Sequence, residues 1–193
     1  MRPMPKKHRT LFIVLIVFIG LTVLFTVNYI RLNRLYPNPA LETYRLGQPV
    51  SVDGFEITAK KFQMMDSDTM IQQYKIDDED VIKEFRGNPK KVVLVTVAVK
   101  NSAKSDQQLF KVIELCNIQS FTYANGMAQD MFHFFNSQNS YKPQLKSGEQ
   151  TTIVLPYDMG DSQFTKENWA NISSRKFDLV VSTYPVKKSI HLN

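Results

Sequence analysis

The feature that most constrains this chain is an uncharged apolar run close to its N-terminus. Residues 10–30 contain no Asp, Glu, Lys or Arg, and most of them are Leu, Ile, Val or Phe. A helix of this length rises about 31 Å, close to the thickness of the hydrocarbon core of a bilayer. We therefore predict one transmembrane helix over residues 10–30, with the lipid bilayer as its partner.

Basic residues on the two sides of this run predict its orientation. Four precede it and two follow it: Arg2, Lys6, Lys7, Arg9, and then Arg31 and Arg34. Because basic residues favour the cytoplasmic side of a span, we expect a cytoplasmic tail (1–9), an uncleaved signal anchor (10–30) and an extracytoplasmic remainder at the cell membrane. The alternative is a cleaved signal peptide, which usually has a shorter apolar run followed by small residues.

The net charge of +6 belongs entirely to this N-terminal part. Residues 35–193 hold 18 basic and 18 acidic residues, so their formal charge is 18 − 18 = 0. A nucleic-acid-binding domain needs a basic face, so we expect no nucleic-acid partner. Cys116 is the only cysteine, which excludes an internal disulfide. We expect it to be a small buried residue.

Apolar and polar residues alternate along much of the remaining chain, which is typical of strands. After a stalk at residues 31–46, this alternation is clearest at 55–59, 92–101, 151–157, 177–182 and 189–192. In the strand at 92–101, four valines share one face, while the other face changes from apolar to polar. That change indicates that only one end of this second face is covered.

Weaker strands are expected at 109–123 and 127–135, joined by a hairpin at Asn125-Gly126. Together these strands predict an all-β fold for residues 47–193, an antiparallel immunoglobulin-like β-sandwich. Residues 64–89 break the alternation. The spacing of Met70, Ile71 and Tyr74 suits a short helix or an irregular insertion there.

Four motifs carry a resemblance to a known family. They are G-x-x-V-x-V-x-G-F-x-I at 47–57, V-x-V-K-N at 97–101, L-K-S-G-E at 145–149 and F-D-L-V-V-S at 177–182. The chain resembles the immunoglobulin-like (telokin-like) extracytoplasmic domains of unknown function from Gram-positive bacteria, which are held at the membrane by one N-terminal helix or a lipid. The resemblance implies an accessory or binding role at the cell surface and brings no catalytic residues.

The aromatic run Met131–Phe135 is the first candidate site. On a strand, Phe132 and Phe134 point to one side and His133 and Phe135 to the other, and both sides are apolar. We therefore consider Phe132, His133, Phe134, Phe135 and the flexible Met70 a candidate interaction surface. The alternative is that the sandwich and the 64–89 insertion cover both sides.

An acidic run offers a second candidate. Asp77, Asp78 and Asp80 could supply oxygen ligands to Ca²⁺. The run lacks the alternation and the central glycine of an EF-hand loop, so the competing interpretation is a solvated polar surface.

Catalytic motifs are missing from the sequence, including G-x-S-x-G, H-E-x-x-H, C-x-x-C and the P-loop. We therefore expect no enzyme and no cofactor. The predicted function is a non-catalytic, membrane-anchored accessory or protein-interaction module of a bacterial envelope or transport system, whose partner is another membrane or cell-wall protein. The alternatives are an extracytoplasmic ligand- or calcium-binding receptor, and a hydrolase built around His133.

Overall fold

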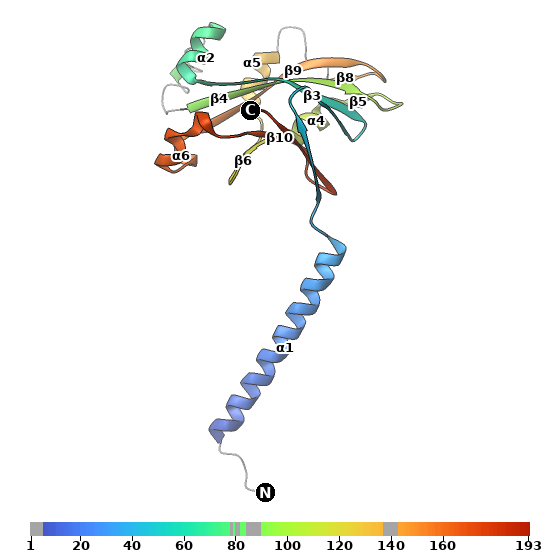
Figure 1. Cartoon of the computed structure of the whole chain (residues 1–193), viewed down its shortest axis with the longest axis vertical. Helices are drawn as coiled ribbons and strands as arrows, with labels where there is room; N and C mark the ends of the chain where they lie inside the picture. The colour runs from blue at the N-terminus through green and yellow to red at the C-terminus, as the bar shows by residue number, and fades with distance from the viewer. Residues whose placement is uncertain (1–5, 78, 80–81, 84–89, 137–142) are drawn as a thin grey trace. The chain divides into compact units, whose positions relative to one another are not determined.

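Figure 1 shows the chain as a computed structural model, which describes residues 6–77, 79, 82–83, 90–136 and 143–193. The chain divides into two compact units, Met1–Pro39 and Ala40–Asn193. Each unit is described by itself.

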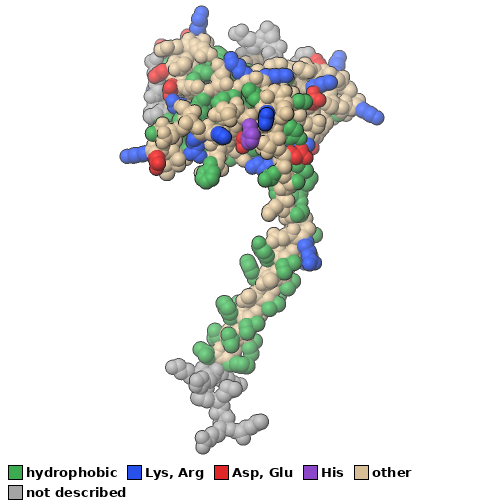
Figure 2. Space-filling model, in the orientation of Figure 1, with side chains coloured by type: hydrophobic (Ala, Val, Ile, Leu, Met, Phe, Trp, Pro, Cys, Tyr) green, Lys and Arg blue, Asp and Glu red, His purple; other side chains and the backbone are tan. Residues whose placement is uncertain are grey.

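The first unit contains the long helix α1 (Lys6–Leu35). Its segment Leu11–Leu35 contains an 18-residue window with a mean hydropathy of 2.7 and is long and apolar enough to cross a membrane. Figure 2 shows hydrophobic side chains along this helix. The hydroxyls of Thr22 and Thr26 donate to the carbonyls of Phe18 and Thr22, at 2.9 and 2.8 Å. These polar groups are therefore satisfied within the helix, as an apolar environment requires.

The second unit is built on two main sheets (Figure 1). The first sheet has the strand order β1-β11-β10-β6-β7, with bounds β1 (Ala40–Arg45), β11 (Val186–His191), β10 (Asp178–Ser182), β6 (Asn117–Ser120) and β7 (Tyr123–Asn125). The second has the order β2-β3-β4-β9, with β2 (Pro49–Val52), β3 (Phe55–Asp66), β4 (Lys90–Asn101) and β9 (Gln150–Gly160). A short pair joins β5 (Gln107–Gln108) to β8 (Gln144–Leu145).

The main core lies between these two sheets. The four valines on one face of β4 are fully buried there, together with Phe55, Ile57, Ile153, Tyr157, Phe177, Leu179 and Ile190. The alternation read from the sequence therefore points the correct side chains inward, because successive side chains on a strand face opposite sides of a sheet.

The outer face of β4 is covered at the end that carries Val92 and Leu94, as predicted. Val92 and Leu94 are buried beneath α2 (Ser67–Tyr74) and α5 (Gln129–Asn136) in a second cluster that includes Met65, Met70, Ile71 and Met131. At the other end of this face, Lys100 is exposed. Of the two alternatives for residues 64–89, a short helix or an irregular insertion, the helix is found near Met70 and Ile71 as α2, and both residues are buried.

Two features of the predicted fold class are wrong. First, the unit is not purely antiparallel, because β1 pairs with β11 in parallel, in the register Ala40↔Val186 to Arg45↔His191. Residues 40–45, predicted to belong to the stalk, form this strand. Second, the unit is not purely β, because it contains α2, α4 (Phe110–Leu115), α5 and α6 (Lys166–Ala170). The structure is a β-sandwich with a mixed sheet and short helices.

Candidate functional site

The aromatic run of the first candidate site lies on a helix, not on the expected strand at 127–135. Met131 and Phe132 of α5 are buried, whereas His133 and Phe134 are exposed. Phe135 is half-buried and packs edge-on against Tyr74 of α2, with ring centroids 4.9 Å apart. Burial of Met131 and Phe132, followed by partial burial of Phe135, is the pattern of one face of a helix. The sequence did not reveal this helix, because a continuous apolar run cannot be assigned to helix or strand by its period.

The structure brings the candidate residues to one region but gives them different roles. Phe132 belongs to the main core, and Met70 and Phe135 belong to the cluster beneath α2 and α5. Phe134 is 46% exposed and stacks edge-on against Phe135 at 5.1 Å. His133 and Phe134 are therefore the members of this set that face outward.

The acidic candidates are only partly described. Asp77 is exposed and follows α2, while Asp78 and Asp80 lie outside the described residues. Among the residues that the structure describes, no group of three or more His, Cys, Asp or Glu side chains converges as a metal site.

Two ionisable side chains, Cys116 and Tyr157, are buried in the main core. Cys116 is buried, as predicted, and burial raises the pKa of its thiol to about 12. The hydroxyl of Tyr157 donates to the Cys116 carbonyl at 3.2 Å, and burial raises the pKa of Tyr157 well above its ordinary value. A thiol that stays protonated is a poor nucleophile, so Cys116 serves packing.

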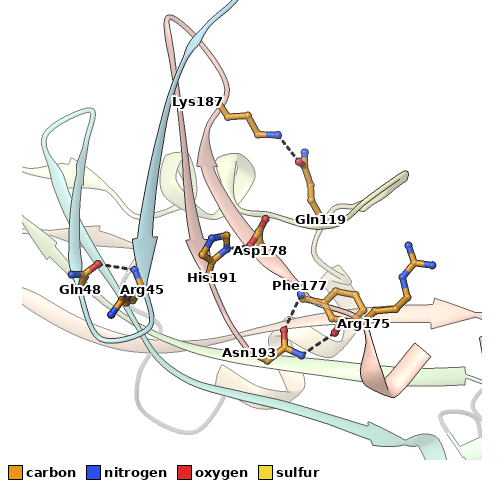
Figure 3. Close-up of polar contacts among 9 residues, drawn as sticks. All are labelled: Arg45, Gln48, Gln119, Arg175, Phe177, Asp178, Lys187, His191 and Asn193. Carbon is orange, nitrogen blue, oxygen red and sulfur yellow. Dashed lines mark hydrogen bonds and ion pairs between the residues drawn. The ribbon is translucent and has the colours of Figure 1, made fainter. Parts of the chain in front are cut away.

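Asn193 ties the segment that follows β11 to the segment that precedes β10, as Figure 3 shows. The Asn193 side chain accepts from the Phe177 backbone N–H at 2.8 Å and donates to the Arg175 carbonyl at 2.9 Å. On the neighbouring strand pair, His191 contacts Asp178 across β10 and β11. These contacts fix the segment that carries Arg175.

The β6–β7 hairpin presents an unusual residue. The register Ser120↔Tyr123 leaves Phe121 and Thr122 as the two turn residues, so the hairpin does not use the predicted Asn125-Gly126 turn. Phe121 has φ = +50° and is 97% exposed. A two-residue hairpin needs a positive φ, which glycine usually supplies. Here the turn geometry forces that conformation on a phenylalanine.

Beside this hairpin lies a groove of about 290 Å³. It is lined by Thr122 and Tyr123 of the hairpin, by Gln163, Phe164 and Asn168 around α6, and by Arg175. The Arg175 guanidinium donates to the side chain and carbonyl of Ser120 at 3.2 and 3.3 Å and lies 5.8 Å from the centre of the Phe164 ring. Arg175 thus ties the hairpin to the other wall of the groove.

A family model for a domain of unknown function, DUF5028, matches residues 40–188. The chain belongs to this family. The match begins at the first residue of β1 and ends within β11, so it spans nearly the whole second unit. No curated protein matches the chain.

Three solved structures that are similar to this DUF5028 chain come from Gram-positive bacteria. A conserved hypothetical protein from Bacillus anthracis is 12% identical with a TM-score of 0.49, covering 78% of this chain and 95% of its own. An uncharacterised β-sandwich protein from Clostridium difficile is 13% identical with a TM-score of 0.44, covering 81% and 97%. A functionally unknown protein from Listeria monocytogenes is 7% identical with a TM-score of 0.44, covering 75% and 79%.

Sequence reasoning missed the hairpin and groove of the DUF5028 domain. The lining residues come from positions 122–124, 163–165, 168 and 175, which no local motif connects. The one available signal is the pair of aromatic residues Phe121 and Tyr123 separated by one residue, which resembles an ordinary strand.

Proposed function

We propose that this DUF5028 chain is a single-pass envelope protein whose β-sandwich acts outside the membrane as a non-catalytic protein-interaction module. The length and hydropathy of α1 support the anchor. The excess of basic residues before the apolar run supports a cytoplasmic N-terminus. The partner in this proposal is another membrane or cell-wall protein.

We also propose that the sandwich is immunoglobulin-like. The neighbour order β11-β10-β6-β7 corresponds to strands G-F-C-C′ of an immunoglobulin variable-type sheet, and the adjacent strands β4 and β9 correspond to B and E. The β2–β3 hairpin adds to the side of β4 opposite β9. This order of neighbouring strands supports the immunoglobulin-like assignment.

The observation that carries the interaction role is the exposure of Phe121. A bulky residue with positive φ costs about 1–3 kcal/mol, and exposing its ring gives no packing energy in return. Such costs cluster at active sites, ligand clamps and switch regions, where the strain is part of the function. Interface anchors are commonly aromatic residues that fill a pocket on the partner. We therefore assign Phe121 as the anchor, with the exposed Phe134 as a separate, weaker contact.

Site-specific photocrosslinking in intact cells tests this role. A photoreactive phenylalanine analogue at position 121 should give one discrete adduct with an envelope protein. The matched control is position 184, because Tyr184 also lies in a hairpin connection and is 51% exposed. Absence of an adduct at position 121, or equal adducts at both positions, would contradict the assignment.

Cysteine labelling tests the topology. Cys116 is buried, so the native chain provides a low background. Lys104→Cys introduces a thiol at an exposed position of the domain, and Lys7→Cys introduces one before the apolar run. On intact cells, a membrane-impermeant maleimide should label Lys104→Cys and spare Lys7→Cys. Labelling of Lys7→Cys without labelling of Lys104→Cys would show that the topology is the reverse of the one proposed.

A further inference from the structure

The groove between the β6–β7 hairpin and α6 has an aromatic floor. Phe164 packs against Tyr123 with ring centroids 4.7 Å apart and against Trp169 at 5.8 Å. Tyr123 is buried, and Phe164 and Trp169 are half-buried against the main core. The Tyr123 hydroxyl donates to the Asp158 carbonyl at 3.3 Å, which fixes this ring. The floor is therefore formed before any ligand arrives.

The rim of the groove is polar and carries a single charge. Thr122, Gln163 and Asn168 are exposed and carry neutral hydroxyl and carboxamide groups, of which the Gln163 oxygen already accepts from the Gly160 backbone N–H at 2.8 Å. Arg175 is half-exposed, and its contacts with Ser120 involve Nε and Nη2, two of the three guanidinium nitrogens. The lining contains no carboxylate. A divalent cation would lack its preferred ligands here.

An aromatic floor with neutral donors and acceptors around it matches the chemistry of a sugar ring. A pyranose has a C–H face that packs on an aromatic ring and an edge of hydroxyls that exchange hydrogen bonds with amides and hydroxyls. The volume of about 290 Å³ lies at the small end of ligand sites and suits one or two such rings. We propose that this groove binds a pyranose-containing saccharide.

This binding site is independent of the protein-interaction role. Phe121 does not line the groove, and the groove residues do not include Phe134. Loss of the Phe121 crosslink and loss of saccharide binding are therefore separate outcomes, obtained with different variants.

Trp169 provides a reporter for the test, because it is the only tryptophan in the chain and packs on the groove residue Phe164. The full-length protein in detergent micelles is titrated with three probes: chitotetraose, cellotetraose and maltotetraose. At least one should change the Trp169 fluorescence saturably. Asn168→Ala and Thr122→Ala should each weaken that binding by up to about tenfold, the effect of one lost neutral hydrogen bond.

Gln129→Ala, an exposed change on α5, is the matched control and should bind as the native protein does. Circular dichroism of each variant verifies folding. A lack of saturable response to all three probes at millimolar concentration overturns the proposal. It is also overturned by a response that Asn168→Ala and Thr122→Ala leave unchanged, or that Phe121→Gly alone removes.

Discussion

The side-chain amide of Asn136 forms two hydrogen bonds with the backbone of Val154, its oxygen accepting from the Val154 N–H and its nitrogen donating to the Val154 carbonyl, each at 2.9 Å. Val154 lies on β9, an edge strand of the second sheet. Asn136 therefore takes the place of a neighbouring strand. Further along, Ala128 N–H donates to the Pro156 carbonyl and Asn125 to the Asp158 carbonyl. These contacts protect an edge that could otherwise pair with another chain.

Replacing Asn136 should destabilise the domain. Asn136→Ala leaves backbone groups of Val154 without their partner and also removes a bond to the Phe132 carbonyl. The free energy of unfolding should fall by about 2–3 kcal/mol. Urea unfolding of the full chain in micelles, followed by Trp169 fluorescence, measures this change. Gln129→Ala should stay within about 0.5 kcal/mol, and an equally small effect of Asn136→Ala would refute the bridging role.

Phe121→Gly should separate stability from function. Glycine adopts a positive φ without steric cost, so relief of strain outweighs the added freedom of the unfolded chain. We expect the free energy of unfolding to rise by up to about 1 kcal/mol, in the same urea assay. The variant should also lose association with the protein captured by the position-121 crosslinker. Loss of stability instead would show that Phe121 is held by contacts within the fold.

Alkaline pH should unfold the domain more readily. Burial raises the pKa of Cys116 and of Tyr123 to about 12 each. In the unfolded chain these groups ionise near 8.5 and 10, so the folded state binds more protons above about pH 8 because of Cys116 and above about pH 9.5 because of Tyr123. The stability that each group contributes is complete below its own onset and is lost as the pH rises from there to about 12. Cys116→Ala should flatten the first part of the decline. A flat pH profile over this range would disagree with this linkage.

The Cys116 thiol should be inert in the folded protein. It is 1% exposed, and its raised pKa keeps it protonated at pH 8. A thiol-specific disulfide reagent should react with the native chain only at the rate of unfolding and with urea-unfolded chain at once. Lys104→Cys supplies the exposed comparison and should react rapidly at one site. Rapid reaction of the native thiol would place Cys116 at the surface.

Parts of this protein follow from local sequence alone. The uncharged run at 10–30 predicts an apolar helix, and α1 contains it. The alternating valines of β4 and the residues Ile153, Leu155 and Tyr157 of β9 point to the core as their period requires. In each case one strand or helix carries the whole signal, because burial on one face imposes its period on the sequence.

Other parts depended on contacts between distant segments. The run at 131–135 has apolar residues at every spacing, and two contacts favour a helix there: the ring contact of Phe135 with Tyr74 and the hydrogen bond of the next residue, Asn136, with Val154. Residues 40–45 form a strand because β11, about 145 residues later, offers its edge. The hairpin at Phe121 and the groove beside it join positions 122, 168 and 175. The sequence by itself determined which residues are apolar and with what period they recur. The tertiary structure decided which strand edges pair and which side chains remain exposed, because those choices depend on the free energy of all the packed segments together.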